Sequence, residues 1–122
     1  MSLGPPTPIL RSFDEAKARA FYIDYLGFHV LFEHRFEPGM PLYLGVQRDG
    51  CELHLSEHHG DASPGASLRI AASDIDALHA ELHSRPNANA RPEVVQQPWG
   101  TRDMSVTDPF GNRLTFTSAV SL

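Results

Sequence analysis

An internal repeat is the feature that most constrains the fold of this chain. Residues 12–15 (Ser-Phe-Asp-Glu) and residues 73–76 (Ser-Asp-Ile-Asp) both have the Ser-x-x-acid form of a helix capping box, about sixty residues apart. Each box follows a short extended segment, residues 7–11 in one half and residues 66–71 in the other. Because both halves enter a helix in the same way, we interpret the chain as two copies of one structural unit.

An amphipathic helix is predicted after each capping box. In the first half, apolar residues recur at i, i+3, i+4, i+7 and i+8, namely Ala18, Phe21, Tyr22, Tyr25 and Leu26. In the second half they recur at i, i+3 and i+7, namely Ile75, Leu78 and Leu82. Each helix is expected to bury one stripe, and Gly27 is expected to end the first helix with a positive φ.

Three extended segments follow each helix. We expect strands over residues 29–36, 42–48 and 51–56 in the first half, and over residues 92–97, 102–107 and 113–117 in the second. Turn-forming residues separate them, including residues 108–112 (Asp-Pro-Phe-Gly-Asn). The order is β-α-β-β-β twice, so we predict an α+β fold. It forms a single domain, residues 1–122, built of a first βαβββ module over residues 7–57 and a second over residues 65–118.

The alternation of residues along these strands predicts two different faces of the sheet. Apolar residues such as Leu44, Leu55 and Val106 are expected to face the helices. The opposite face carries polar and aromatic residues such as Tyr43 and His54. This second face either curves around a small molecule or faces water.

Charge and cysteine content exclude several classes of protein. The formal charge is −5 with neutral histidines, so the chain offers no basic surface to a nucleic-acid backbone. No window approaches the roughly 18 apolar residues of a membrane span. Cys51 is the single cysteine, which excludes an internal disulfide or a zinc site of paired cysteines, and the N-terminus lacks a secretory pattern. We therefore expect a cytoplasmic protein with neither nucleic acid nor membrane as a partner.

Three stretches of sequence carry a resemblance to a known family. They are residues 20–28 (Ala-Phe-Tyr-Ile-Asp-Tyr-Leu-Gly-Phe), residues 97–100 (Gln-Pro-Trp-Gly) and residues 108–112. With them the chain resembles the vicinal oxygen chelate superfamily, which includes lactoylglutathione lyase, fosfomycin-resistance enzymes, extradiol dioxygenases and bleomycin-resistance proteins. It looks most like the bleomycin-resistance branch. The resemblance implies a mostly antiparallel sheet curved around a groove, helices on its outer face, and a homodimer.

The enzymes of this superfamily hold a divalent metal with side chains from their first, fourth, fifth and eighth strands. The matching residues here are Thr7, His54, Gly65 or Ser67, and Thr115. Only His54 is a metal ligand by type, and a catalytic metal site normally has three protein ligands. The resemblance therefore implies a metal-independent protein with no cofactor and no catalytic residues, which sequesters a small molecule. The alternatives are a metal-dependent lyase, transferase or dioxygenase that uses His54, and a subunit whose grooves have lost their ligand.

A sequestering protein of this kind needs side chains that stack on a ligand and side chains that match its charge. The ligand implied is planar and aromatic or cationic, such as a glycopeptide antibiotic. Trp99 lies in a turn and offers a flat ring for stacking, with Phe32, Phe36 and Tyr43 as further candidates. On the polar face, Arg69 either clamps an anion or reaches water, whereas Asp103 favours a cation. The candidate ligand-binding residues are Trp99, Phe32, Phe36, Tyr43, His54, Arg69, Asp103 and Thr115.

Histidines form the other group of candidate ligands. His54, Glu57, His58 and His59 are close in sequence, but neighbours on a strand point to opposite faces, so these side chains converge only if the chain turns. His79 and His83 stand four apart on the second predicted helix. They either chelate a cation or lie on the exposed face of the helix.

Overall fold

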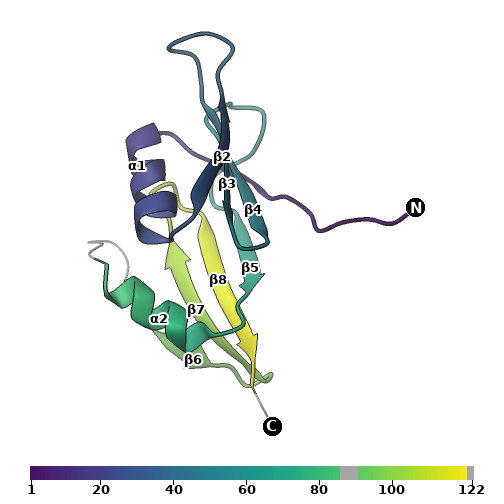
Figure 1. The fold of residues 1–122 in the computed structure, drawn as a ribbon, viewed down its shortest axis with the longest axis vertical. Coiled ribbons are helices and arrows are strands. Elements are labelled where there is room, and N and C mark those ends of the chain that lie inside the picture. The colour runs from purple at the N-terminus through teal and green to yellow at the C-terminus, as the bar shows by residue number, and fades with distance from the viewer. Residues whose placement is uncertain (86–90, 121–122) are drawn as a thin grey trace. The chain divides into compact units, whose positions relative to one another are not determined.

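The computed structural model describes residues 1–85 and 91–120, which form two compact units, Met1–Pro64 and Gly65–Leu122. The first unit contains β1 (Ile9–Arg11), α1 (Glu15–Arg19), the π-helix η1 (Ala20–Tyr25), β2 (His29–His34), β3 (Tyr43–Arg48) and β4 (Cys51–Ser56). The second contains β5 (Ser67–Ala71), α2 (Ile75–His83), β6 (Val94–Gln96), β7 (Thr101–Thr107) and β8 (Arg113–Ala119). The predicted α+β class and the tandem βαβββ order are confirmed (Figure 1).

Each unit has its own open four-stranded sheet. The strand order is β1-β4-β3-β2 in the first unit and β5-β8-β7-β6 in the second. The first and last strands of each unit pair in parallel, and all other pairs are antiparallel. In the second unit α2 contacts β6, β7 and β8 and so covers one face of its sheet (Figure 1). We call the face of each sheet that carries its polar and aromatic side chains the open face.

The helices begin at aspartates, and the prediction that serines cap them is wrong. A carboxylate oxygen of Asp14 accepts a hydrogen bond from the Lys17 backbone N–H at 2.9 Å. Asp74 does the same for Ala77 at 3.0 Å. The Ser12 N–H instead donates to the Ser56 carbonyl, because Ser12 continues the pairing of β1 with β4. Asp14 lies two residues after Ser12 and Asp74 lies one residue after Ser73, and their carboxylates cap the helices instead.

The first helix buries the predicted stripe. Ala18, Phe21, Tyr22, Tyr25 and Leu26 are all at most 3% exposed. The second half of this helix widens into a π-helix, with the Leu26 N–H donating to the Phe21 carbonyl at 2.9 Å. Gly27 follows with φ 78°, as predicted, and ends the helix in the conformation that glycine adopts most easily.

The predicted alternation within the strands is confirmed for the core. Nine apolar residues of the strands and of the residue before β3 are at most 5% exposed, namely Leu42, Leu44, Val46, Leu53, Leu55, Met104, Val106, Leu114 and Phe116. Leu68 and Ile70 of β5 are partly exposed instead. The predicted strand over residues 29–36 ends at His34, because a Pro38-Gly39 turn follows with Gly39 at φ 84°. Phe36 therefore lies in a loop.

The turn at residues 108–112 is built around a buried pair of polar side chains. Asp108 is 4% exposed and Asn112 is fully buried. The Asp108 carboxylate accepts hydrogen bonds from the Phe110 and Asn112 backbone N–H groups and from the Asn112 side-chain amide, each at 2.8 Å. Asn112 in turn accepts from the Ala66 N–H at 3.2 Å. This motif thus connects the β7–β8 hairpin to the chain that enters β5, which gives it a structural role.

No helix among residues 1–85 and 91–120 combines the length and the apolar character needed to cross a membrane.

Candidate functional site

One row of side chains crosses the open face of the first sheet. The strand registers pair Ile9 with His54, His54 with Gly45, and Gly45 with Phe32. Residues paired across neighbouring strands project from the same face. The next row contains Tyr43 and His34, which are also paired in register. Aromatic and imidazole groups from β2, β3 and β4 therefore meet on this face.

A β-bulge in β2 directs Phe32 to the open face. Val30 pairs with the core residue Val46, but two residues later Phe32 pairs with Gly45 instead of Leu44. The extra residue, Leu31, shifts the register by one and reverses which side chains point outward. Without the bulge, Phe32 would project with Val30 toward the core.

The absence of a side chain at Gly45 leaves room for the Phe32 ring. A β carbon added to Gly45 would lie 2.7 Å from Cδ1 and 2.8 Å from Cζ of Phe32, closer than non-bonded carbons approach. The ring therefore lies directly on the backbone of β3, where any side chain at position 45 would displace it. Position 45 requires glycine because the Phe32 ring contacts its backbone closely.

The Phe32 ring is part of an aromatic cluster with Tyr43 and His54. It stacks on Tyr43 with centroids 6.1 Å apart and planes at 12°, and its edge meets His54 at 5.2 Å. The Tyr43 hydroxyl lies 2.7 Å from His54 Nδ1, and His54 Nε2 lies 2.6 Å from a carboxylate oxygen of Glu52. A neutral imidazole satisfies both contacts when Nε2–H donates to Glu52 and Nδ1 accepts from the Tyr43 hydroxyl.

A recess adjoins this cluster within the first unit. Its volume is about 400 Å³, and it is lined by Phe32, His34, Phe36, Tyr43, His58 and Asp61. Rings supply most of this lining, and Asp61 supplies the carboxylate. The Asp61 side chain is held in place by the Ser56 hydroxyl, which donates to it at 2.6 Å. The recess thus combines aromatic rings with one carboxylate, which suits a small organic ligand that carries positive charge.

The electrostatic environment of this recess is negative. Burial raises the pKa of the Tyr43 hydroxyl, and the nearby charges of Asp61 and Glu52 raise it further. The same field that opposes an anionic phenolate favours a bound cation. A cation is attracted both by these carboxylates and by the faces of the aromatic rings.

The open face of the second sheet carries a polar network. The Arg69 guanidinium donates two hydrogen bonds to Asp103, each of 3.2 Å, and one to the Thr117 hydroxyl at 3.0 Å. Thr117 donates to Asp103 at 2.7 Å, and the Ser105 and Thr115 hydroxyls lie 2.8 Å apart. The sequence left Arg69 and Asp103 as separate candidates for an anion and a cation. The structure pairs their charges with each other.

This network makes the stability of the fold depend on pH. Burial alone raises the pKa of Asp103, but the hydrogen bonds from Thr117 and Arg69 outweigh it, so the net pKa is lowered. A lowered pKa contributes stability above the ordinary carboxyl pKa of about 3.9, and that stability is lost as the pH falls through the folded-state value.

We expect Asp103→Asn to reduce the free energy of unfolding by about 1–2 kcal/mol at pH 7, because the charge-assisted bonds to Arg69 are lost. The difference from the wild-type protein should shrink as the pH falls below about 4, because the unfolded wild-type chain then takes up a proton that the folded chain takes up only at a lower pH. Urea unfolding at pH 7 and at pH 3 measures both values. An equal difference at the two pH values would show that the Asp103 charge contributes nothing.

The structure places the sequence-predicted site residues in two groups. Phe32, Phe36, Tyr43 and His54 belong to the first unit, and all but His54 line the recess. Arg69, Asp103 and Thr115 lie on the open face of the second sheet. Trp99 lies in the turn between β6 and β7 and is 65% exposed.

Three lining residues of the recess were missed as ligand-binding candidates: His34, His58 and Asp61. His34 carries a usable signal, because it follows Phe32 by two residues and so shares its face. Asp61 carries none, since it comes from the connection after β4 and reaches the recess through tertiary contact.

The residues present do not fit the divalent metal that enzymes of the resembled superfamily hold. By strand register, Ile9 stands beside His54, and Arg69 stands beside Thr115. Thr7 and Ser67 precede Ile9 and Arg69 by two residues, so they lie one row away from those pairs. An alkyl chain and a guanidinium are not metal ligands, and both nitrogens of His54 already contact Tyr43 and Glu52.

The cluster that looked densest in sequence does not converge. Glu57 accepts a hydrogen bond from the Leu42 N–H at 2.9 Å, and His58 faces the recess. Within residues 1–85 and 91–120, the one group of three potential ligands close enough to share an ion is His79, His83 and Glu93.

The fold defines a class of proteins built from two βαβββ modules, each with an open sheet face. Comparison with known proteins agrees with this class. The family described as glyoxalase superfamily protein matches residues 3–121. The chain therefore belongs to the glyoxalase superfamily. A search of curated proteins finds no match.

Solved structures with the same fold include two antibiotic-binding proteins. The bleomycin-binding protein from Streptomyces verticillus, solved with copper(II)-bleomycin, is 29% identical with a TM-score of 0.73, and the alignment covers 100% of this chain and 99% of that one. The antibiotic-binding protein TnmS3 from Streptomyces sp. CB03234 is 25% identical with a TM-score of 0.72 and 98% coverage of both chains. A putative glyoxalase family protein from Bacillus anthracis, 21% identical with a TM-score of 0.71 over 98% of this chain and 97% of that one, shares the fold.

Proposed function

We propose that this protein binds and sequesters a planar aromatic cation without a metal of its own. The recess of the first unit carries the proposal, because Phe32, Phe36 and Tyr43 line it together with the carboxylate of Asp61. Two structural neighbours support it, since one was solved with a bleomycin complex and the other is an antibiotic-binding protein. A bleomycin-like glycopeptide antibiotic is the first ligand to test.

The lining is better suited to binding than to conversion. The raised pKa of the Tyr43 hydroxyl makes it a poor nucleophile, and the aromatic rings and the Asp61 carboxylate supply stacking and charge. Stacking and charge complementarity need only a preformed recess. We propose that Trp99, Arg69, Asp103 and Thr115 of the second unit also contribute to ligand binding.

Titration with metal-free bleomycin, a planar aromatic cation and its uncharged analogue tests the proposal. We expect saturable heat on calorimetry for the cationic ligands, weaker binding of the uncharged analogue, and no effect of EDTA. Quenching of Trp99 fluorescence in the same titration tests the role of that residue separately. Loss of binding in EDTA, or no binding across the panel, would contradict the proposal.

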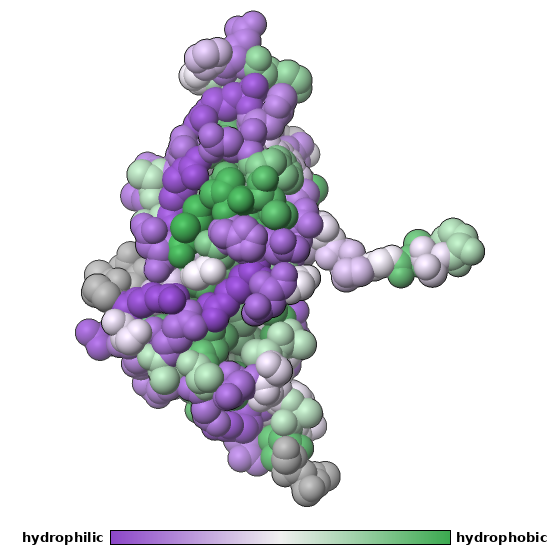
Figure 2. Space-filling model, in the orientation of Figure 1, coloured by the Kyte–Doolittle hydropathy of each residue, from purple (hydrophilic) through white to green (hydrophobic). Residues whose placement is uncertain are grey.

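We also propose that the protein forms a homodimer through the edge strand β2. All six residues of β2 are exposed, and Val30, Leu31 and Phe32 are 38%, 42% and 41% exposed. Figure 2 shows an apolar patch surrounded by hydrophilic residues on the first unit. An unpaired, apolar edge strand is a surface that usually pairs with another chain.

We place this dimer in the cytoplasm, where the single thiol of Cys51 stays reduced.

We expect Leu31→Glu to convert the dimer into a monomer, because a carboxylate would be buried at the centre of the edge. Light scattering coupled to size exclusion measures the mass. Val95→Glu, at an apolar residue of β6 that is 52% exposed, is the matched control and should leave the dimer intact. A wild-type monomer, or dissociation by Val95→Glu alone, would refute the proposed interface.

A further inference from the structure

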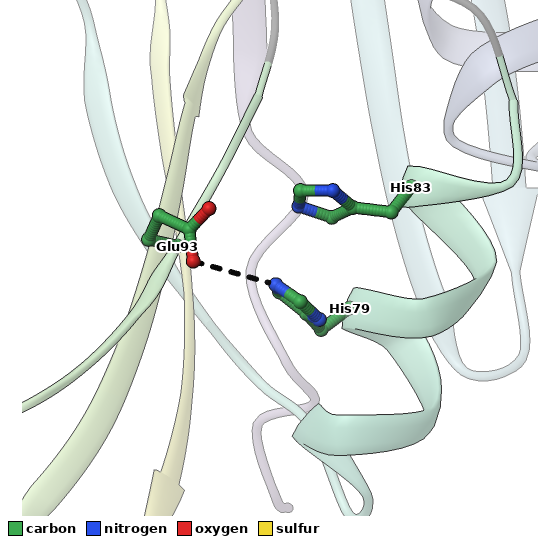
Figure 3. Close-up of side chains that lie close together, drawn as sticks. All are labelled: His79, His83 and Glu93. Atoms are coloured by element: carbon green, nitrogen blue, oxygen red, sulfur yellow. Dashed lines mark ion pairs between the residues drawn. The ribbon is translucent and has the colours of Figure 1, made fainter.

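Two histidines and a glutamate meet on the second unit, on elements that the proposed binding function does not use. His79 and His83 stand one turn apart on α2, and their ring centroids are 4.1 Å apart. Glu93 immediately precedes β6 and faces them, with a carboxylate oxygen 3.7 Å from His79 Nε2 (Figure 3). One potential ligand atom from each of the three residues lies within 4.8 Å of the others.

The backbone around these side chains is held in place. His83 Nε2 lies 2.6 Å from the carbonyl oxygen of Pro92, the residue next to Glu93. Pro92 is buried, and α2 contacts β6. The last turn of the helix therefore contacts the segment that carries Glu93, so Glu93 stays near the two histidines although it lies ten residues after His83 in sequence.

We propose that His79, His83 and Glu93 bind a divalent transition-metal ion of the Zn²⁺ class. Two imidazoles and one carboxylate form a donor set that suits such ions, and three protein ligands leave one position for water. Bonds of about 2.0–2.2 Å hold tetrahedral ligands roughly 3.4 Å apart, so the side chains must close by a little over 1 Å. Glu93 is 74% exposed and can rotate to do so.

The site is independent of the recess, which belongs to the first unit. Its residues lie on α2 and just before β6, away from the four strand positions at which the superfamily's enzymes hold their metal. A bound ion would connect α2 to β6 directly. We therefore expect it to raise the stability of the second unit as the ion is added.

Titration of the untagged full-length chain with Co²⁺ tests the site. We expect one Co²⁺ per chain, visible absorption bands of a four- or five-coordinate ion, and displacement by Zn²⁺. His79→Asn and His83→Asn should each lower the affinity at least tenfold, because two ligands remain. Glu93→Gln should lower it as well and weaken the visible bands by changing the coordination. Zn²⁺ should also raise the melting temperature of the wild-type chain.

His59→Asn provides the matched control, since it removes an exposed histidine outside both the proposed metal site and the recess. We expect it to bind Co²⁺ like the wild-type chain, and circular dichroism verifies that every variant is folded. The proposal is overturned if this control loses the ion, if His79→Asn and His83→Asn keep it, or if Glu93→Gln has no effect on affinity or spectrum. Binding of the planar cation in EDTA is measured on the same samples, so failure of one proposal is distinguishable from failure of the other.

Discussion

Gly45→Ala is expected to lower the affinity for a planar aromatic cation about tenfold, as much as Phe32→Ala does. The added methyl group would overlap the Phe32 ring, which must then leave the face of β3. Stacking of one aromatic ring contributes about 1–1.5 kcal/mol, which corresponds to this loss of affinity. Calorimetric titration of the two single variants measures it.

The double variant Gly45→Ala with Phe32→Ala separates this explanation from general damage to the strand. With the ring absent, the atoms that the methyl group would overlap are gone, so the second substitution should cost no further affinity. Alanine in a strand is also about 0.5–1 kcal/mol more favourable than glycine, so urea unfolding should show the double variant to be at least as stable as Phe32→Ala. A further loss of affinity in the double variant would mean that Gly45 acts by some route other than Phe32.

Asp61→Asn is expected to weaken binding of a planar cation about five- to tenfold and to leave an uncharged analogue of the same shape unaffected. Asparagine keeps an oxygen that accepts from the Ser56 hydroxyl, so the shape of the recess is preserved while its charge is removed. Loss of one charge near a partly buried ligand corresponds to roughly 1 kcal/mol. Calorimetry with both ligands at low and at physiological salt measures the effect and its screening.

Asp49→Asn is the control for net charge. Asp49 lies in the turn after β3 with its side chain 95% exposed, about 20 Å along the strand from Tyr43. This separation exceeds the screening length of about 8 Å at physiological salt, so its charge should not reach the ligand. Equal losses in the two variants, or an equal loss for the uncharged analogue, would show that the recess does not select its ligand by the charge of Asp61.

The sequence predicted most of what the fold contains because those features depend on short-range periodicity. Helix stripes and strand alternation follow from 3.6-residue and two-residue repeats, and the structure confirms them for the first helix and for β3, β4, β7 and β8. Leu78 of α2 and Leu68 and Ile70 of β5 were expected in the core and are only partly buried. The turns were also predicted from a few neighbouring residues, and the positive φ of Gly27 and Gly111 confirms them. The prediction of capping serines was wrong in both modules, and in the first module Ser12 continues the pairing of β1 with the distant strand β4.

The residues of the candidate site were less accessible to such reasoning. Phe32 and Tyr43 were predicted to bind a ligand because they are aromatic. Their stacking depends on the β-bulge in β2, which the local sequence pattern does not predict. Asp61 reaches the recess from the connection after β4, and Glu93 joins the histidines of α2 from the start of β6. In each case the deciding contact joins residues that are far apart in the chain or out of regular register.

The amino-acid sequence by itself predicted the two βαβββ modules, the buried stripe of the first helix, the core residues of β3, β4, β7 and β8, and the position of His79 and His83 one turn apart on a helix. Backbone geometry over a few residues is sufficient for each of these. Tertiary structure alone decided that Phe32 turns outward over Gly45, that Asp61 gives the recess its charge, and that Glu93 completes a set of three ligands. These outcomes depend on strand register and on distances between segments, which are settled when the whole core packs.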